Sequence, residues 1–285
     1  MRVLVHIQQH LDETIELDEL AHIAHFSPYH FHRIFRGMVG ESLMEHVRRL
    51  RLERAAHRLK FTDKSVTNIA FDAGYETLEA FSRVFRTMFD ESPSQFREAH
   101  QALPFRSVPS GIHFVADGKV PDLHAGQDGK ALDVRIEWVA TTRVAFIRHT
   151  GPYDQVGITW GRLMSWAGRQ GLLANRPRAI GVVHDDAEVT VPNRLRYDAC
   201  LALGQDFRTE GEIGVQEIGG ESFAIAKHRG PYNQLGDTYS RLLGQWMPAN
   251  GREPKSAPAL EVYLNSPNDT PPADLVTEIS IPLAD

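Results

Sequence analysis

The chain has 285 residues, of which 42% are hydrophobic, and a formal net charge of −6. This length allows two domains, each with a core of its own. No apolar run approaches the roughly 20 residues of a membrane-spanning helix, and the first residues turn polar too early for a signal peptide. We therefore expect a cytoplasmic protein with no membrane partner. The single cysteine, Cys200, has no disulfide partner in the chain and lies in an apolar stretch typical of a buried strand.

The acidic total gives no overall electrostatic sign of nucleic-acid binding. The charge is unevenly distributed, however, because the segment 33–60 contains eight basic and three acidic residues, a local charge of +5. This segment predicts either a basic face that contacts DNA or an ordinary solvated helix face.

The first hundred residues contain an internal repeat. The segment 31–36, FHRIFR, returns fifty positions later as FSRVFR in 81–86. In both copies the apolar residues recur at helical spacing, and each copy predicts a short helix, a turn and a second helix. A single copy would be typical of core packing in any helical bundle, but the matched pair favours two helix-turn-helix units.

Capping signals place the helix starts in this half. The second helix of each helix-turn-helix unit is expected to begin at a capping residue. These residues are Ser27, which is followed by proline, and Thr77, and Gly74 suits the tight turn before Thr77. Ser42 and Glu45 form a capping box that opens a connecting helix to about Lys60, roughly 28 Å long at 1.5 Å per residue. Such a connector would place the two second helices near successive major-groove turns, roughly 34 Å apart.

The segment from about Asp18 to Arg97 resembles the DNA-binding domain of the AraC/XylS family. The resemblance rests on both repeat copies, the long connecting helix and the SPSQFR motif at 92–97, with Asp90 where the family often has glycine. It implies that the helices starting at Ser27 and Thr77 recognise double-stranded DNA. The expected contact residues are Tyr29, His30, Arg33, Leu78, Glu79 and Arg83. Of these, the two arginines suit guanine edges or phosphates, Glu79 suits a cytosine amino group and Leu78 suits a thymine methyl.

A second repeat fills the other half, after a segment rich in glycine and proline at 101–130 that we interpret as a linker or arm. RHTGPY at 148–153 returns as KHRGPY at 227–232, and 182–203 aligns with 262–283. We therefore expect domains at 1–100 and 131–285, the latter made of repeats 131–210 and 211–285. Each repeat predicts strand, helix, strand and strand, and so an α+β domain with a pseudo-twofold axis. A cleft at that axis would gather Tyr153, Trp160, Tyr232, Tyr239 and Tyr263, whose alternative role is core packing.

The segment from about Leu132 to Leu283 resembles the GyrI-like effector-binding family, notably at both Gly-Pro-Tyr turns. In that family a glutamate on the last strand faces the ligand cleft, and Glu278 stands at the matching position. A carboxylate on an aromatic-lined face would select cations, although composition alone favours a solvent-facing acid at this position. The resemblance implies hydrophobic, often cationic effectors, and the domain order is similar to that of Rob-type regulators.

These patterns predict a transcription regulator with an all-α double helix-turn-helix domain, followed by a duplicated α+β domain that binds a small molecule. We expect no enzymatic activity and no cofactor. The histidines His22, His25, His30 and His32 lack the further ligands of a metal site. Two alternatives stay open for the second half: a small-molecule hydrolase using Glu278 with a tyrosine, or a module that binds a protein such as RNA polymerase.

Overall fold

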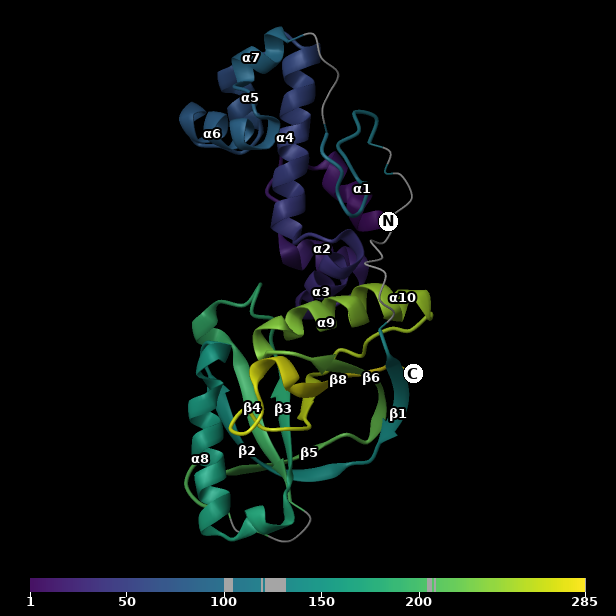
Figure 1. Ribbon diagram of the computed structural model, residues 1–285. Helices are drawn as coiled ribbons and strands as arrows, with labels where there is room; N and C mark the ends of the chain where they lie inside the picture. The colour runs from purple at the N-terminus through teal and green to yellow at the C-terminus, as the bar shows by residue number, and fades with distance from the viewer. Residues whose placement is uncertain (100–104, 119, 121–131, 204–206, 208, 285) are drawn as a thin grey trace. The chain divides into compact units, whose positions relative to one another are not determined.

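The computed structural model describes residues 1–99, 105–118, 120, 132–203, 207 and 209–284. The chain divides into two compact units, Met1–Asp128 and Gly129–Asp285 (Figure 1). No helix within the described ranges is long and apolar enough to cross a membrane.

The first unit is helical. Ser27 and Thr77 cap the helices that follow them by accepting hydrogen bonds from the backbone amides of His30 and Ala80, and the capping box at Ser42 is present. These predictions are confirmed. The helices are α1 (Arg2–Gln9), α2 (Leu17–Ala24), α3 (Pro28–Val39), α4 (Leu43–Phe61), α5 (Val66–Asp72), α6 (Leu78–Phe89) and α7 (Pro93–Glu98).

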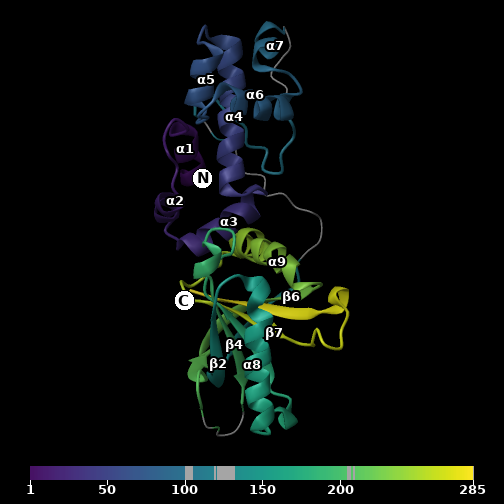
Figure 2. The same ribbon diagram turned by 90° about the vertical axis from the view of Figure 1, so that its left-hand side faces the viewer.

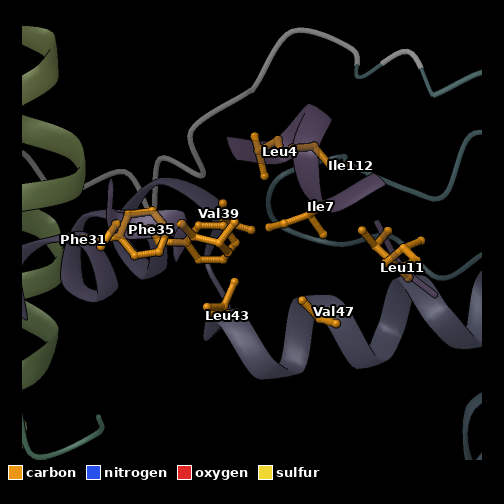
Figure 3. Packing of buried hydrophobic residues seen from close by; sticks show 12 residues of the cluster. Leu4, Ile7, Leu11, Phe31, Phe35, Val39, Leu43, Val47 and Ile112 are labelled. Carbon is orange, nitrogen blue, oxygen red and sulfur yellow. The ribbon is translucent and has the colours of Figure 1, made fainter. Parts of the chain in front are cut away.

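Helix α4 joins two separate apolar cores. Its first half contributes Leu43, Val47 and Leu50 to a core with α1, α2 and α3 (Figure 3). Its second half contributes residues such as Leu52 and Leu59 to a core with α5, α6 and α7. Because both cores are built on one continuous helix, each helix-turn-helix unit (α2 with α3, α5 with α6) is fixed to the same rigid axis.

The turns of the two helix-turn-helix units have the same left-handed backbone conformation but different residues. Gly74 takes a positive φ of 83° after α5, as predicted, and His25 takes 61° at the corresponding turn after α2. At the ends of α3 and α6, Gly40 (81°) and Asp90 (63°) occupy the same left-handed region. Asp90, the departure from the family pattern, therefore keeps the geometry that glycine would give, because a short polar side chain tolerates this region.

The described part of the expected arm, 105–118, packs on this first unit. Ile112 is fully buried in the first core. The carboxylate of Glu53 accepts hydrogen bonds from the backbone amide of Phe114 (2.8 Å) and from His113 Nδ1 (3.0 Å). Gln8 donates to the carbonyl of His113 at 2.8 Å. The segment lacks helix and strand, but a buried carboxylate on α4 holds it in place.

Gly40 provides a stability prediction with a matched control. Gly40→Ala should lower the free energy of unfolding of the first unit by about 1 kcal/mol more than Gly111→Ala. Both glycines have a positive φ, but a Cβ on Gly40 would lie 2.6 Å from the Cβ of Pro109, whereas one on Gly111 meets nothing within 4 Å. Urea unfolding followed by circular dichroism measures the difference. Equal losses for the two variants would show that Pro109 does not pack as described.

The second unit is one antiparallel sheet with helices (Figure 2). Its strand order is β1-β6-β8-β7-β3-β4-β2-β5, and exchanging β1 with β5, β2 with β6, β3 with β7 and β4 with β8 gives the same order reversed. The strands are β1 (Val134–Val139), β2 (Thr142–Thr150), β3 (Arg178–Val183), β4 (Arg196–Ala202), β5 (Gly214–Ile218), β6 (Glu221–Arg229), β7 (Ala259–Tyr263) and β8 (Val276–Pro282), and the main helices are α8 (Val156–Arg169) and α9 (Leu235–Arg241). A helical first domain followed by an α+β domain is confirmed.

The two faces of this sheet have different partners. Helix α8 packs against β2 and β4, and α9 packs against β6. We call this side the helix face; on β7 it carries Glu261 and Tyr263, which bond to or pack against side chains of these helices. The opposite face carries an apolar cluster that includes Ile180, Leu260 and Val262. Successive residues of a strand alternate between these faces.

Candidate functional site

Two of the predicted DNA-contact residues, Arg33 and Arg83, occupy equivalent places in α3 and α6, although Arg33 is buried and Arg83 is exposed. Arg33 is the sixth residue of α3 and Arg83 the sixth residue of α6. The Arg33 guanidinium lies over the Tyr29 ring, 4.8 Å from its centroid, and Ser27 Oγ lies 3.2 Å from His30 Nδ1. These contacts order the start of α3.

In the second helix-turn-helix unit Glu79 and Arg83 are exposed, whereas Leu78 is partly buried against the core. Leu78 therefore has a packing role of its own, and the exposed pair is available to a partner. Helices α3 and α6 both begin with a side-chain cap, Ser27 and Thr77.

The basic stretch on α4 does not form a free basic face. Arg54 pairs with Asp12 at 2.8 Å, and Arg58 pairs with Asp72 at 2.7 Å. Arg51 donates to the carbonyl of Leu11 at 3.0 Å. These three arginines connect α4 to the chain before α2 and to α5, and so help to hold the first unit together.

One ion-pair network at the start of α4 is particularly well enclosed. Glu41 lies beside His46 (2.7 Å) and Arg49, and Arg49 also donates to the buried Glu53 at 2.9 Å. Burial opposes ionisation of Glu41, but hydrogen bonds from His46 and Arg49 outweigh it and lower the pKa of Glu41 to about 2. The turn between α3 and α4 is thus held by charge-assisted bonds.

On the helix face of the second unit, six aromatic side chains gather around one carboxylate. The ring centroids of Trp160 and Tyr263 are 5.7 Å apart, those of Tyr232 and Tyr263 are 5.4 Å apart, and those of Tyr153 and Tyr197 are 6.1 Å apart. The group contains all five aromatic residues expected at the effector site. We call it the aromatic cluster: Tyr153, Trp160, Tyr197, Tyr232, Tyr239 and Tyr263.

A chain of hydrogen bonds runs through this cluster to Glu261. Trp160 Nε1 donates to the Tyr197 hydroxyl (3.0 Å), which lies 2.8 Å from the Tyr263 hydroxyl. Tyr263 donates to Glu261 Oε2 at 2.6 Å, and Tyr239 donates to Oε1 at 3.1 Å. Glu261 is 7% exposed. Burial, and then the nearby Glu261 carboxylate, raise the pKa of Tyr197 and Tyr263 well above the usual tyrosine value, so both hydroxyls stay neutral donors.

Sequence reasoning missed two members of this site, Glu261 and Tyr197. Glu261 had a usable signal, since it alternates with Leu260 and Val262 and shares a strand face with Tyr263. Tyr197 is accommodated by Gly181, where an added Cβ would overlap the Tyr197 ring. A glycine in the middle of a strand often marks such a close approach.

Glu278 lies on the other face of the sheet. It is directly opposite Val262 in the pairing of β7 with β8, and Val262 packs in the apolar cluster. Arg135 donates to both of its carboxylate oxygens at 2.9 Å. The expectation that Glu278 shares a face with the aromatic residues therefore differs from the structure, and Glu261 is the carboxylate that they surround.

The repeat explains the role of Glu278. Its counterpart in the first repeat is Asp198, and Arg148 donates to both oxygens of Asp198 at 2.7 and 2.9 Å. Arg148 lies opposite Asp198 on the neighbouring strand. In both repeats, then, this position holds a carboxylate that forms a bidentate pair with an arginine, which indicates a structural role.

Asp198 gives a pH-dependent stability prediction. Burial opposes its ionisation, but hydrogen bonds from Arg148 and His184 outweigh this and lower its pKa from 3.8 to about 2. A lowered pKa contributes stability that is complete above the unfolded value and is lost as the pH falls from about 4 toward 2. Asp198→Asn should therefore cost about 2 kcal/mol near pH 7.

The measurement is urea unfolding of both proteins between pH 7 and pH 3. The difference in the free energy of unfolding between wild type and variant should shrink as the pH falls below about 4. Asp269→Asn, at an exposed turn position, should show no such trend. A difference that stays constant with pH would mean that the Asp198 carboxylate is not held by these partners.

The structure offers no metal site in the part of the chain that it describes, where no three histidine, cysteine, aspartate or glutamate side chains are grouped to hold an ion. Cys200 is buried, and burial raises the pKa of its thiol to about 12.

Comparison with known proteins agrees with this division. Residues 132–284 match the GyrI-like small molecule binding domain, and residues 20–99 match a helix-turn-helix domain. The regulatory protein SoxS of Salmonella typhimurium (strain LT2) is 37% identical over 91 residues, which cover 32% of this chain and 85% of SoxS. The probable transcriptional regulator YgiV of Escherichia coli (strain K12) is 28% identical over 156 residues, which cover 54% of this chain and 97% of YgiV.

Among solved structures, the C-terminal domain of EcmrR is similar over 55% of this chain and 99% of that domain, at 20% identity and a TM-score of 0.45. The first of the two domain matches alone spans more than half of the chain. The chain belongs to the AraC-type helix-turn-helix transcription regulators that carry a C-terminal GyrI-like small molecule binding domain. Both resemblances found in the sequence are confirmed.

Proposed function

We propose that this regulator responds to a hydrophobic cation that binds at Glu261 and the aromatic cluster of the second unit. The observation that carries the proposal is a buried carboxylate surrounded by tyrosine and tryptophan side chains on the helix face. A negative charge in such a place attracts a positive one more strongly than it would in water.

The chemistry of the cluster favours a particular kind of effector. Aromatic faces attract cations through their quadrupoles and bury apolar ligand surface at the same time. The hydroxyls of Tyr239 and Tyr263 donate to Glu261 while remaining neutral, so they stabilise the carboxylate without neutralising its charge. A flat or bulky aromatic cation would match both the rings and the charge.

We also propose that the second unit is a duplicated structure. The strand order is unchanged, except for its direction, when the strands of the two repeats are exchanged. The pseudo-twofold axis then passes between β3 and β7, where Gly181 lies directly opposite Glu261. Two carboxylates at this axis would repel each other, so the glycine in the first repeat suits a site built on a single glutamate.

In the first unit, we propose that α3 and α6 enter successive major-groove turns and that Arg33, Glu79 and Arg83 make base or phosphate contacts. This assignment is supported by the equivalent positions of Arg33 and Arg83 and by the single helix α4, which joins the two helix-turn-helix units. Tyr29, His30 and Leu78 complete the proposed set. RNA polymerase is a proposed partner, since a regulator bound at a promoter acts on that enzyme.

The experiment that tests the effector assignment is a titration of the full chain with tetraphenylphosphonium, followed by tryptophan fluorescence. We expect saturable quenching that is largely lost in Trp160→Phe, because Trp160 is the tryptophan in the cluster. Triphenylphosphine oxide, which is neutral and similarly aromatic, should bind much more weakly. If neither compound gives a saturable signal, or if both bind equally, the cation proposal is wrong.

A further inference from the structure

Strand β1 is an edge of the sheet with an exposed surface. It stands last in the strand order and, among the strands that the structure describes, pairs only with β6 (Figure 1). Trp138 is 66% exposed and Ile136 is 46% exposed. Native edge strands are usually protected from pairing by proline, bulges or repelling charges, and the segment Val134–Val139 contains no proline and no glycine.

The charges on β1 are of opposite sign. Arg135 and Glu137 lie on one face of the strand, and Ile136 and Trp138 lie on the other. Both charged side chains are about half exposed. Within one copy Arg135 Nε donates to Glu137 at 2.9 Å, and the other two guanidinium nitrogens donate to Glu278. An edge with one positive and one negative residue two positions apart can complement a second copy of itself instead of repelling it.

We propose that two copies of this chain associate through their β1 strands, antiparallel, with Ile136 at the twofold axis. In this register Arg135 of each copy lies opposite Glu137 of the other, and Val134 lies opposite Trp138 on the second face. The contact is isologous, as closed two-fold dimers require, and it joins the two sheets edge to edge.

The charges select this register over its neighbours. Residues directly opposite in an antiparallel pair share a face, so the axis must pass through a residue. An axis at Arg135 would place two arginines opposite each other, and an axis at Glu137 would place two glutamates opposite each other. Both arrangements are destabilising, whereas the axis at Ile136 produces two opposite-charge pairs.

The other edge strand lacks this property. Strand β5 (Gly214–Ile218) pairs only with β2 in the described part of the sheet, and its one charged residue is Glu217. No antiparallel register of β5 with itself pairs opposite charges. Glu217 is exposed and therefore supplies a matched control for Glu137.

The test is the mass of the full chain in solution, measured by sedimentation velocity at tens of micromolar. We expect a species of twice 32.1 kDa. Glu137→Arg should raise the dissociation constant of the dimer by about tenfold or more, because two attractive pairs become repulsive ones. Glu217→Arg should leave this constant unchanged. Circular dichroism confirms that each variant is folded. A monomeric wild type, or a dimer that Glu137→Arg does not weaken, overturns the proposal.

Disulfide crosslinking tests the register itself. Ile136→Cys should crosslink rapidly under mild oxidation, since the two substituted positions face each other across the axis. Trp138→Cys should not, because its two copies would be offset by four residues along the strands, roughly 13 Å, which is too far for a disulfide. The native Cys200 is buried and does not compete. Crosslinking of Trp138→Cys without Ile136→Cys would contradict the register.

Discussion

Glu261→Gln should weaken binding of tetraphenylphosphonium to the full chain by roughly 2 kcal/mol or more, about 30-fold, because removal of a buried charge from a charge pair typically costs this much. The substitution keeps the shape of the side chain. Its amide oxygen can still accept the hydrogen bond that Tyr263 donates at 2.6 Å, so the cluster should remain packed. The effect should therefore fall on the cation and not on the fold. Isothermal titration calorimetry measures it.

The second unit contains a closely matched control. Glu278→Gln makes the same chemical change on the opposite face of the sheet, where the carboxylate pairs with Arg135. We expect the affinity for the cation to stay within about twofold of wild type. If Glu278→Gln weakened binding and Glu261→Gln did not, the effector site would lie on the face that carries the apolar cluster, and our assignment would be wrong.

Arg33→Ala and Arg83→Ala should each weaken specific DNA binding by roughly 1–3 kcal/mol, and the double variant by roughly the sum, because the two residues lie in separate helix-turn-helix units. The DNA site is first obtained by selection from a random duplex library with the full chain. It should contain two conserved blocks one helical turn apart. Competition binding with fluorescent DNA then gives the affinities.

Two further measurements define the DNA contacts. Arg252→Ala, an exposed arginine of the second unit, should leave specific affinity unchanged. If an arginine contacts a phosphate, its loss should also reduce the salt dependence of binding by about one unit of slope. A footprint that covers a single major-groove turn, or a double variant no weaker than either single one, would contradict reading by two helices.

Local signals in the first unit were sufficient to predict where α3, α4 and α6 begin. Ser27, Ser42 and Thr77 each cap the helix that was expected, since capping depends on residues close in sequence. The role of the α4 arginines could not be predicted in this way. Arg54 pairs with Asp12, some forty positions earlier, and such partners are chosen by tertiary packing.

The aromatic cluster illustrates the same limit. Trp160 and Tyr263, which were expected to lie near each other, have ring centroids 5.7 Å apart. Alternation along β8 predicts that Glu278 and Ile279 lie on opposite faces of the sheet, but it does not predict which face the helices cover. That choice follows from strand register and helix packing, which place Glu261 beside Tyr239.

We propose that this chain couples occupation of the Glu261 site to DNA binding. The most direct test is the dissociation constant of the full chain for its selected DNA, with and without saturating tetraphenylphosphonium. We predict a change of about fivefold or more in wild type and no change in Glu261→Gln at the same concentration. Equal constants for wild type, at a concentration where calorimetry shows the site to be full, would contradict the claim.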